Sequence, residues 1–153
     1  MTKRFKDKII PWLFKREGTS YENDPDDPGN RGHVNSPQFV GTKFGIDARS
    51  HEGVDIKNLT DEKATDIYWN EWIRDGCDHL PSPLDWIFFD ACVNCGMGRA
   101  QQFLTASAKD PKRFQKERID YYNRLAYQKP RLSKYRKGWI SRVIDLSKVA
   151  GVV

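Results

Sequence analysis

Long apolar runs are missing from this sequence of 153 residues. A membrane-spanning helix needs about 20 consecutive apolar residues, and no stretch of the chain approaches that length. The N-terminus also lacks the pattern of a secretory signal peptide. Its short apolar stretch, residues 9–14, is followed at once by Lys15, Arg16 and Glu17 instead of small residues and a cleavage site. We therefore expect a chain that is made in the cytoplasm without a signal peptide and is not stably inserted in a membrane.

Cysteine is scarce, and three cysteines cannot all pair within one chain. Cys92 and Cys95 form a C-x-x-C pair downstream of Cys77 and His79, so a zinc site with three cysteines and one histidine is conceivable. The pair, however, lies in an apolar stretch that is typical of a helix, and it lacks the surroundings of a zinc finger. We expect reduced, mostly buried thiols and no metal.

Motifs that would bring a cofactor are absent as well. The sequence contains no HExxH, no P-loop and no dinucleotide-binding glycine motif after a strand. The stretch Asp24-x-Asp26-x-Pro28-Gly29 begins like a calcium loop, but its fifth position is proline and its twelfth is Asn35 instead of a bidentate glutamate. We expect no cofactor.

Acidic residues are few near the C-terminal end. Residues 112–142 carry eleven Lys and Arg against two acidic residues, a net charge of +9, whereas the whole chain has +5. A basic end on an otherwise acidic body indicates a polyanionic partner such as nucleic acid, anionic lipid or an anionic cell envelope. The alternative is a solvated helix face without a partner. No nucleic-acid-binding motif accompanies the charge, which counts against nucleic acid.

Apolar residues at helical spacing predict a mainly α-helical chain. A first helix is expected over residues 3–17, with Pro11 either kinking it or marking its true start, and with Gly18 as its stop. A turn-rich stretch, residues 23–36, and a short β segment around residues 40–46 follow. Further helices are expected from Thr60, over residues 84–103 with interruptions at Gly96 and Gly98, from Asp110, and from Tyr135. The predicted fold class is mainly α (α+β, lysozyme-like), a helical bundle with a small β-hairpin excursion after the first helix.

Four carboxyl groups lie where the first helix gives way to a loop. Glu17 closes the predicted helix, and Asp24, Asp26 and Asp27 follow within ten residues. Glycoside hydrolysis requires a protonated acid at the leaving oxygen and a second carboxylate that activates water or stabilises the cationic centre. An acid at the edge of an apolar helix face is favoured in its protonated form, whereas aspartates in a polar turn stay ionised. On this chemistry alone, solvated scaffolding is the alternative interpretation of the turn.

Six motifs, in order along the chain, resemble one known family. They are EGTSY (17–21), NDPDDPG (23–29), TKFGI (42–46), LPSP (80–83), FDACVNCGMGRA (89–100) and GWISRV (138–143). Together they resemble glycoside hydrolase family 108, whose signature runs EGGY, NDPxDxGG and TxxGI and which includes phage endolysins and bacterial muramidases. The sequence departs from that signature at Thr19-Ser20, which replaces the second glycine of EGGY. It departs again over residues 30–41, which predict an enlarged loop beside the groove.

The resemblance implies roles for individual residues. Glu17 matches the family's essential acid, and Asp24 and Asp27 match the two aspartates of NDPxD, with Asp26 at the variable position. The spacing also resembles the Glu, Asp and Thr pattern of phage-type lysozymes, in which Asp27 and Thr42 take the second and third places. We therefore expect Glu17 and Asp27 to be catalytic, and Asp24 and Thr42 to bind substrate.

Three more residues are candidates for substrate binding. Tyr21 and Phe44 can form a stacking platform for sugar rings, with packing inside the hairpin as the alternative. Asn94 can hydrogen-bond an N-acetyl group, and the alternative is an ordinary polar residue of a helix. The histidines are scattered along the chain, and we assign them no catalytic role.

The expected function is that of an endolysin, which hydrolyses the β-1,4 bond between N-acetylmuramic acid and N-acetylglucosamine in bacterial peptidoglycan and so lyses the host cell. Within one compact domain, residues 1–100 would form the catalytic lysozyme-like part and residues 101–153 a helical, basic, peptidoglycan-binding-like part. We expect a monomer that binds peptidoglycan and no nucleic acid, and that reaches the periplasm or cell wall by a separate, holin-type route. The alternatives are a lytic transglycosylase and a non-catalytic peptidoglycan-binding or secretion accessory protein.

Overall fold

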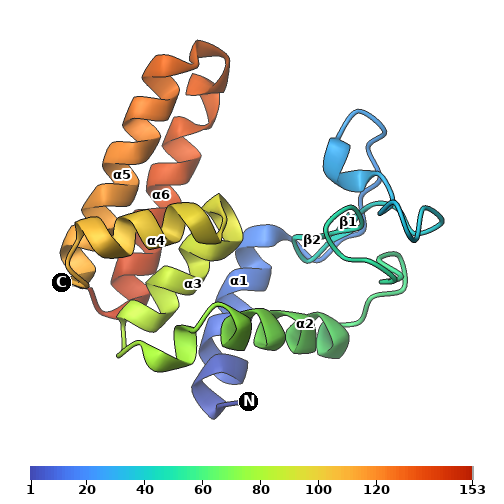
Figure 1. Ribbon diagram of the computed structural model, residues 1–153, viewed down its shortest axis with the longest axis horizontal. Coiled ribbons are helices and arrows are strands. Elements are labelled where there is room, and N and C mark those ends of the chain that lie inside the picture. Colours follow the sequence, from blue (N-terminus) through green and yellow to red (C-terminus); the bar gives the residue numbers. More distant parts are fainter. Residues whose placement is uncertain (153) are drawn as a thin grey trace. The chain divides into compact units, whose positions relative to one another are not determined.

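The computed structural model describes residues 1–152 as six α-helices, several short 3-10 or π-helical turns and one two-stranded antiparallel sheet (Figure 1). Val153, the last residue of the predicted C-terminal part, lies outside the described residues. The chain divides into two compact units, Met1–Glu71 and a second that begins at Trp72. Among the described residues, no helix has the length and apolar character needed to cross a membrane. The predicted fold class, mainly α and lysozyme-like with a small hairpin after the first helix, is confirmed.

The first unit begins with a helix that ends at Glu17. A π-helical turn, Phe5–Ile9, runs directly into α1 (Ile10–Glu17). Pro11 is the second residue of α1 and follows the π-helical turn closely. Because the preceding residues are already helical, its missing N–H removes a donor from the hydrogen-bond ladder where the π-helical turn gives way to the regular α-helix. Gly18 ends the helix with a positive φ of 85°, which a glycine adopts without strain. Both positions agree with the sequence prediction.

A tight hairpin follows the aspartate-rich loop. β1 (Thr42–Lys43) pairs antiparallel with β2 (Ile46–Asp47), and Thr42 lies opposite Asp47. The two turn residues, Phe44 and Gly45, both have positive φ, 57° and 78°, as two-residue hairpin turns of this hand require. The Phe44 ring packs 4.7 Å from that of Phe14 on α1, so the hairpin is held against the first helix by apolar contact.

The helix α2 (Asp61–Arg74) closes the first unit and continues into the second. Its N-terminus is capped by the Thr60 hydroxyl, which accepts a hydrogen bond from the Lys63 N–H at 3.3 Å, as the sequence predicted. The buried Tyr68 on α2 donates its hydroxyl hydrogen to the Phe44 carbonyl at 2.7 Å. This bond ties the turn of the hairpin to α2.

The described part of the second unit consists of helices joined by short turns and contains no strand. After a 3-10 turn, Cys77–His79, come α3 (Leu84–Cys95), α4 (Met97–Ala106), α5 (Pro111–Gln128), a 3-10 turn Pro130–Tyr135, and α6 (Arg136–Ala150). The apolar helix predicted over residues 84–103 is two helices, because Gly96 takes a φ of 84° and ends α3. The helix expected from Asp110 is α5, and the Asp110 side chain caps it by accepting from the Arg113 N–H at 2.8 Å. The helices α5 and α6 lie side by side (Figure 1).

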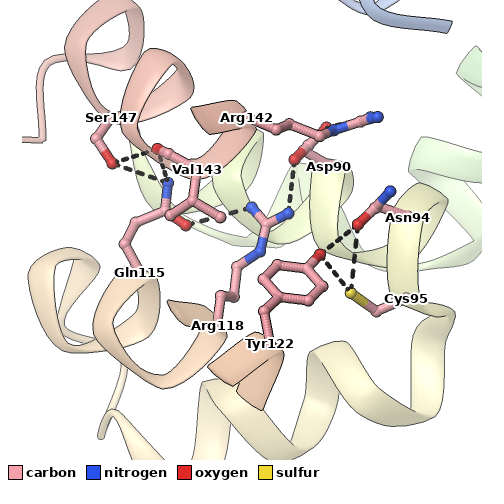
Figure 2. Close-up of polar contacts among 9 residues, drawn as sticks. All are labelled: Asp90, Asn94, Cys95, Gln115, Arg118, Tyr122, Arg142, Val143 and Ser147. Atoms are coloured by element: carbon pink, nitrogen blue, oxygen red, sulfur yellow. Dashed lines mark hydrogen bonds and ion pairs between the residues drawn. The ribbon is translucent and has the colours of Figure 1, made fainter. Parts of the chain in front are cut away.

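A buried ionic cluster joins three helices of this unit (Figure 2). Asp90 on α3 accepts hydrogen bonds from Arg118 on α5 at 2.8 Å and from Arg142 on α6 at 2.7 Å. Burial opposes the charge on Asp90, but the two guanidiniums hold the pKa of this carboxyl below its usual 3.8. Gln115 accepts from Arg118 at 3.2 Å and donates to Ser147 at 3.1 Å, which completes the link from α5 to α6.

Asp90→Asn should destabilise the protein strongly, because it removes the carboxylate that pairs with two buried guanidiniums. Removing one partner of a buried ion pair costs about 3–5 kcal/mol, and urea unfolding measures that loss. Asp120→Asn, which breaks the exposed pair with Lys116, is the matched control and should shift the unfolding midpoint little. Equal losses in the two variants would contradict the assigned role of Asp90.

Candidate active site

Glu17 stands at the C-terminal end of α1 with its side chain seated against the hairpin turn. A Cβ atom built on Gly45 would lie 2.7 Å from Cγ and 2.9 Å from Cβ of Glu17. The same atom would lie 2.9 Å from the Tyr68 hydroxyl oxygen. Separations this short leave no room for a side chain, so glycine at position 45 allows the hairpin backbone to lie directly on Glu17.

The aspartate turn is shaped by two of its own carboxylates. Asp24 Oδ1 accepts from the Asp26 N–H at 2.9 Å, and Asp27 Oδ1 accepts from the Gly29 N–H at 2.8 Å. The second bond caps a short 3-10 turn, Pro28–Asn30. All three aspartates are exposed. Asp26, at the variable position, accepts no hydrogen bond from the described residues, which separates it from its two neighbours.

Asn30 connects this turn to the hairpin, and sequence reasoning missed it. It is 4% exposed. Its Nδ2 donates to the Asp24 carbonyl at 3.1 Å, its Oδ1 accepts from the Thr42 hydroxyl at 2.6 Å, and its own carbonyl accepts from the Gly41 N–H at 2.7 Å. In the sequence, Asn30 is one more turn-forming residue in a stretch full of them, so no local pattern distinguishes a buried asparagine from a solvated one.

The hairpin therefore contacts both sets of carboxyl groups. Its turn lies on Glu17, and Thr42 of β1 reaches the aspartate turn through Asn30. A Cβ atom on Gly29 would lie 3.5 Å from Cβ of Asp47 on β2, so the second strand borders the aspartate turn as well. The structure thus assembles four of the predicted site residues around one element: Glu17, Asp24, Asp27 and Thr42. A helix-end carboxyl and loop carboxylates held by one hairpin can serve as an acid and a second carboxylate.

The other candidates have different surroundings. Tyr21 packs its half-buried ring over Gly41, and its hydroxyl donates to the Val40 carbonyl at 3.2 Å. Phe44 is 2% exposed and lies in the core beside Phe14. This position agrees with the alternative interpretation, in which the ring serves packing and not the stacking of a sugar. Asn94 belongs to the second unit, where it is exposed at the end of α3 and accepts hydrogen bonds from the Tyr122 hydroxyl and the Cys95 thiol (Figure 2).

A histidine fastens the end of the hairpin to α2. His51 Nδ1 lies 2.8 Å from the Asp47 carbonyl oxygen, and Nε2 lies 3.3 Å from Oε1 of Glu71. Burial lowers the pKa of His51, but the bonds to the Glu71 carboxylate and the Asp47 carbonyl outweigh it, so the pKa stands above 6.5. Because the folded pKa is raised, this link stabilises the fold fully below pH 6.5 and loses strength as the pH rises through the folded value.

The thiols and possible metal ligands complete the inventory of reactive groups. Cys77 and Cys92 are buried and Cys95 is half-buried, and all three are free thiols. Burial raises the pKa of the Cys95 thiol, with Arg118 and the Tyr122 hydroxyl opposing the shift. In residues 1–152, no three His, Cys, Asp or Glu side chains come together as a metal site.

Comparison with known proteins matches this region of the chain to a family. The model of the family glycosyl hydrolase 108 matches residues 10–96, a region that holds Glu17, the aspartate turn and the hairpin. A solved structure described as that of SagA from Brucella abortus is similar over 97% of this chain and 94% of that chain, with 28% sequence identity and a TM-score of 0.66. No curated protein matches the sequence.

Gly45→Ala should cost more stability than Gly53→Ala. Both glycines have similar φ, 78° and 75°, so each variant carries backbone strain of about 1–2 kcal/mol. Only the methyl group at position 45 meets other atoms, since nothing lies within 4 Å of a Cβ at Gly53. Urea unfolding should show the larger loss at position 45, and NMR should show the Glu17 carboxyl signal shifted there alone. Equal losses with an unmoved Glu17 signal would contradict the close packing.

Proposed function

The chain belongs to the glycosyl hydrolase 108 family, and on that premise we propose that it is an N-acetylmuramidase of the endolysin type. Its substrate would be bacterial peptidoglycan, cleaved at the β-1,4 bond between N-acetylmuramic acid and N-acetylglucosamine. The family expected from the sequence is confirmed by the match over residues 10–96, and membership makes the protein a glycoside hydrolase. The observation that carries the finer proposal is the placement of Glu17 at a helix end on the hairpin that also holds the aspartate turn.

In the proposed reaction, Glu17 is the general acid. Its carboxyl proton passes to the glycosidic oxygen as the bond from that oxygen to the anomeric carbon breaks, and positive charge develops on the sugar ring. Precise placement of the acid matters, because a displacement of about 1 Å can cost roughly 10²-fold in rate. The contact between Glu17 and the Gly45 backbone supplies that placement.

Asp27 is the proposed second carboxylate. One of its oxygens is occupied by the Gly29 N–H, whereas the other accepts no hydrogen bond from the described residues. The latter oxygen is available to orient a water molecule or to stabilise the cationic ring. Asp24 and Thr42 then act mainly by holding this turn in place, together with Asn30.

The C-terminal residues, 101–153, are the proposed peptidoglycan-binding part, and residues 1–100 the catalytic part. Two of the eleven basic residues in 112–142, Arg118 and Arg142, are buried with Asp90 and add little to the surface charge. Exposed members, including Arg131, Lys134, Arg136 and Lys137, remain to attract an anionic wall. We also propose a monomer that acts in the periplasm or cell wall after release by a holin-type route.

Glu17→Gln should abolish most of the activity, because the amide keeps the shape of the side chain but has no acidic proton to donate. Loss of a general acid costs about 10²–10⁴-fold in rate. Clearing of a purified peptidoglycan suspension measures the rate, and circular dichroism confirms that the variant is folded. A folded variant that clears the wall at the wild-type rate would refute the assignment.

The products of the wild-type reaction decide among the candidate activities. Mass spectrometry of digested peptidoglycan should show reducing N-acetylmuramic acid ends. Anhydro ends would identify a lytic transglycosylase, and an absence of fragments would identify a non-catalytic binding protein.

Asp27→Asn should impair activity more than Asp26→Asn does. Asparagine at position 27 can still accept the hydrogen bond from the Gly29 N–H, so the variant removes charge and leaves the turn intact. Asp26 forms no such contact and serves as the neighbouring control. The same clearing assay measures both rates, and the opposite order would show that the second carboxylate is Asp26.

A further inference from the structure

A basic hollow of about 450 Å³ is formed by the enlarged loop, residues 30–41, and by one residue that follows β2. It is lined by Arg31, Gly32, His33, Val34 and Arg49. Both arginines are exposed, and neither guanidinium forms an ion pair or hydrogen bond with any described residue. Glu52 is paired with a lining side chain, at 3.9 Å from His33 Nδ1, and not with either arginine. The hollow therefore presents two positive groups whose hydrogen-bond donors are unused.

The hollow borders the proposed catalytic turn. The Arg31 N–H donates to the Pro28 carbonyl at 3.4 Å, and the Arg49 N–H donates to the Gly29 carbonyl at 3.3 Å. Both backbone anchors thus lie on the 3-10 turn whose cap is Asp27. A polymer with its scissile bond at Asp27 would carry its neighbouring substituents past these two arginines.

Close packing and hydrogen bonds fix the shape of the loop that lines the hollow. Gly32 fits tightly against the chain, since a Cβ there would lie 2.6 Å from Pro37 Cα and 2.8 Å from the Phe39 carbonyl oxygen. Ser36 is 4% exposed, donates its N–H to the His33 carbonyl at 2.9 Å, and accepts from the Gly53 N–H at 2.8 Å. A loop fixed in this way presents its side chains with less loss of conformational entropy on binding.

Guanidinium groups favour one class of ligand above others. They are planar, permanently charged and matched to the two oxygens of a carboxylate or phosphate group. On the proposed function, the polymer at the neighbouring turn is peptidoglycan, whose glycan strand is uncharged except for the groups attached to it. Those groups are the peptide stems, which bear carboxylates, and any anionic polymers, which bear phosphates.

We propose that Arg31 and Arg49 form a subsite for an oxyanion attached to the glycan strand, so that the enzyme prefers decorated peptidoglycan to bare glycan. The proposal rests on the proposed function and names a determinant of its substrate specificity. The enlarged loop, which departs from the family signature, then contributes Arg31 to that preference, and the segment after β2 contributes Arg49.

The test compares Arg31→Gln/Arg49→Gln with the control Lys8→Gln/Lys15→Gln, which removes the same charge from exposed positions on the first helix. Each protein acts on three substrates: intact peptidoglycan, peptidoglycan stripped of its phosphate polymers, and a bare glycan made from the stripped material. The bare glycan is freed of peptides by an amidase, and the lactyl carboxylates that the amidase exposes are then converted to methylamides. On intact peptidoglycan, the arginine variant should lose about tenfold in kcat/KM, mainly through KM, and the control should not. On bare glycan, the arginine variant and the wild type should be equal.

The substrates also identify the oxyanion. If removing the peptides abolishes the difference between variant and wild type, the ligand is a carboxylate, and if removing the phosphate polymers does so, it is a phosphate. A loss that is equal on all three substrates, or equal to that of the control, would overturn the proposal.

A binding measurement keeps this proposal separate from the proposed function. In Glu17→Gln, the arginine Nε–H signals of an NMR spectrum can be followed while soluble peptide-bearing glycan is added. Shifted signals at Arg31 and Arg49 in a protein whose wild type has no hydrolytic activity would refute the function and keep the subsite. Hydrolysis by the wild type with unshifted signals would refute the subsite and keep the function.

Discussion

The contact between the Gly45 backbone and the Glu17 side chain is the constraint on which the candidate site depends. A carboxyl at the end of a helix has several rotamers available, and a general acid must occupy one of them. The hairpin turn removes that freedom by lying within van der Waals distance of the Glu17 methylene groups, which only a glycine permits. The turn is itself held by a hydrogen bond from the Tyr68 hydroxyl to the Phe44 carbonyl and by packing of the Phe44 ring against Phe14. The motif TKFGI is thus a structural support for EGTSY, although the two are separated in sequence.

Asn30 extends the same support to the second carboxylate. The aspartates and prolines of this turn are exposed, so the turn is not held in place by burial of its side chains and depends on hydrogen bonds to a rigid partner. The buried amide of Asn30 supplies them, by joining the Asp24 carbonyl to the Thr42 hydroxyl. Thr42, expected to bind substrate, therefore has a structural partner that accounts for its place beside the turn. The enlarged loop begins at this residue. Arg31 in that loop and Arg49 after β2 are both anchored by their backbone N–H groups to the turn that Asp27 caps.

In the second unit, the packed helices carry many basic residues, and two of these are buried. Arg118 and Arg142 face inward, and the single carboxylate of Asp90 pairs with both. The cost of burying these charges is reduced by their direct hydrogen bonds to Asp90 and by the bond of Arg118 to Gln115. The remaining basic residues of α5 and α6 lie mostly at the surface, so the sequence count of charge overstates what a partner would meet.

Local features of this chain were readable from the sequence, because caps and turns depend on neighbouring residues. Gly18 as the stop of α1, Thr60 as a cap, Asp110 as the start of a helix, and the hairpin around residues 40–46 are all of this kind. So is the family, since its motifs are short and contiguous. The sequence indicated an interruption at Gly96 but did not show whether the helix would end there. The positive φ of Gly96 decides this, because it ends α3 and separates it from α4. Only the tertiary structure decided that Asn30 and Phe44 are buried and that Glu17 packs against Gly45. The same holds for the burial of Arg118 and Arg142. Each of these depends on partners from distant parts of the chain, and no local pattern records which residue will come to lie against which.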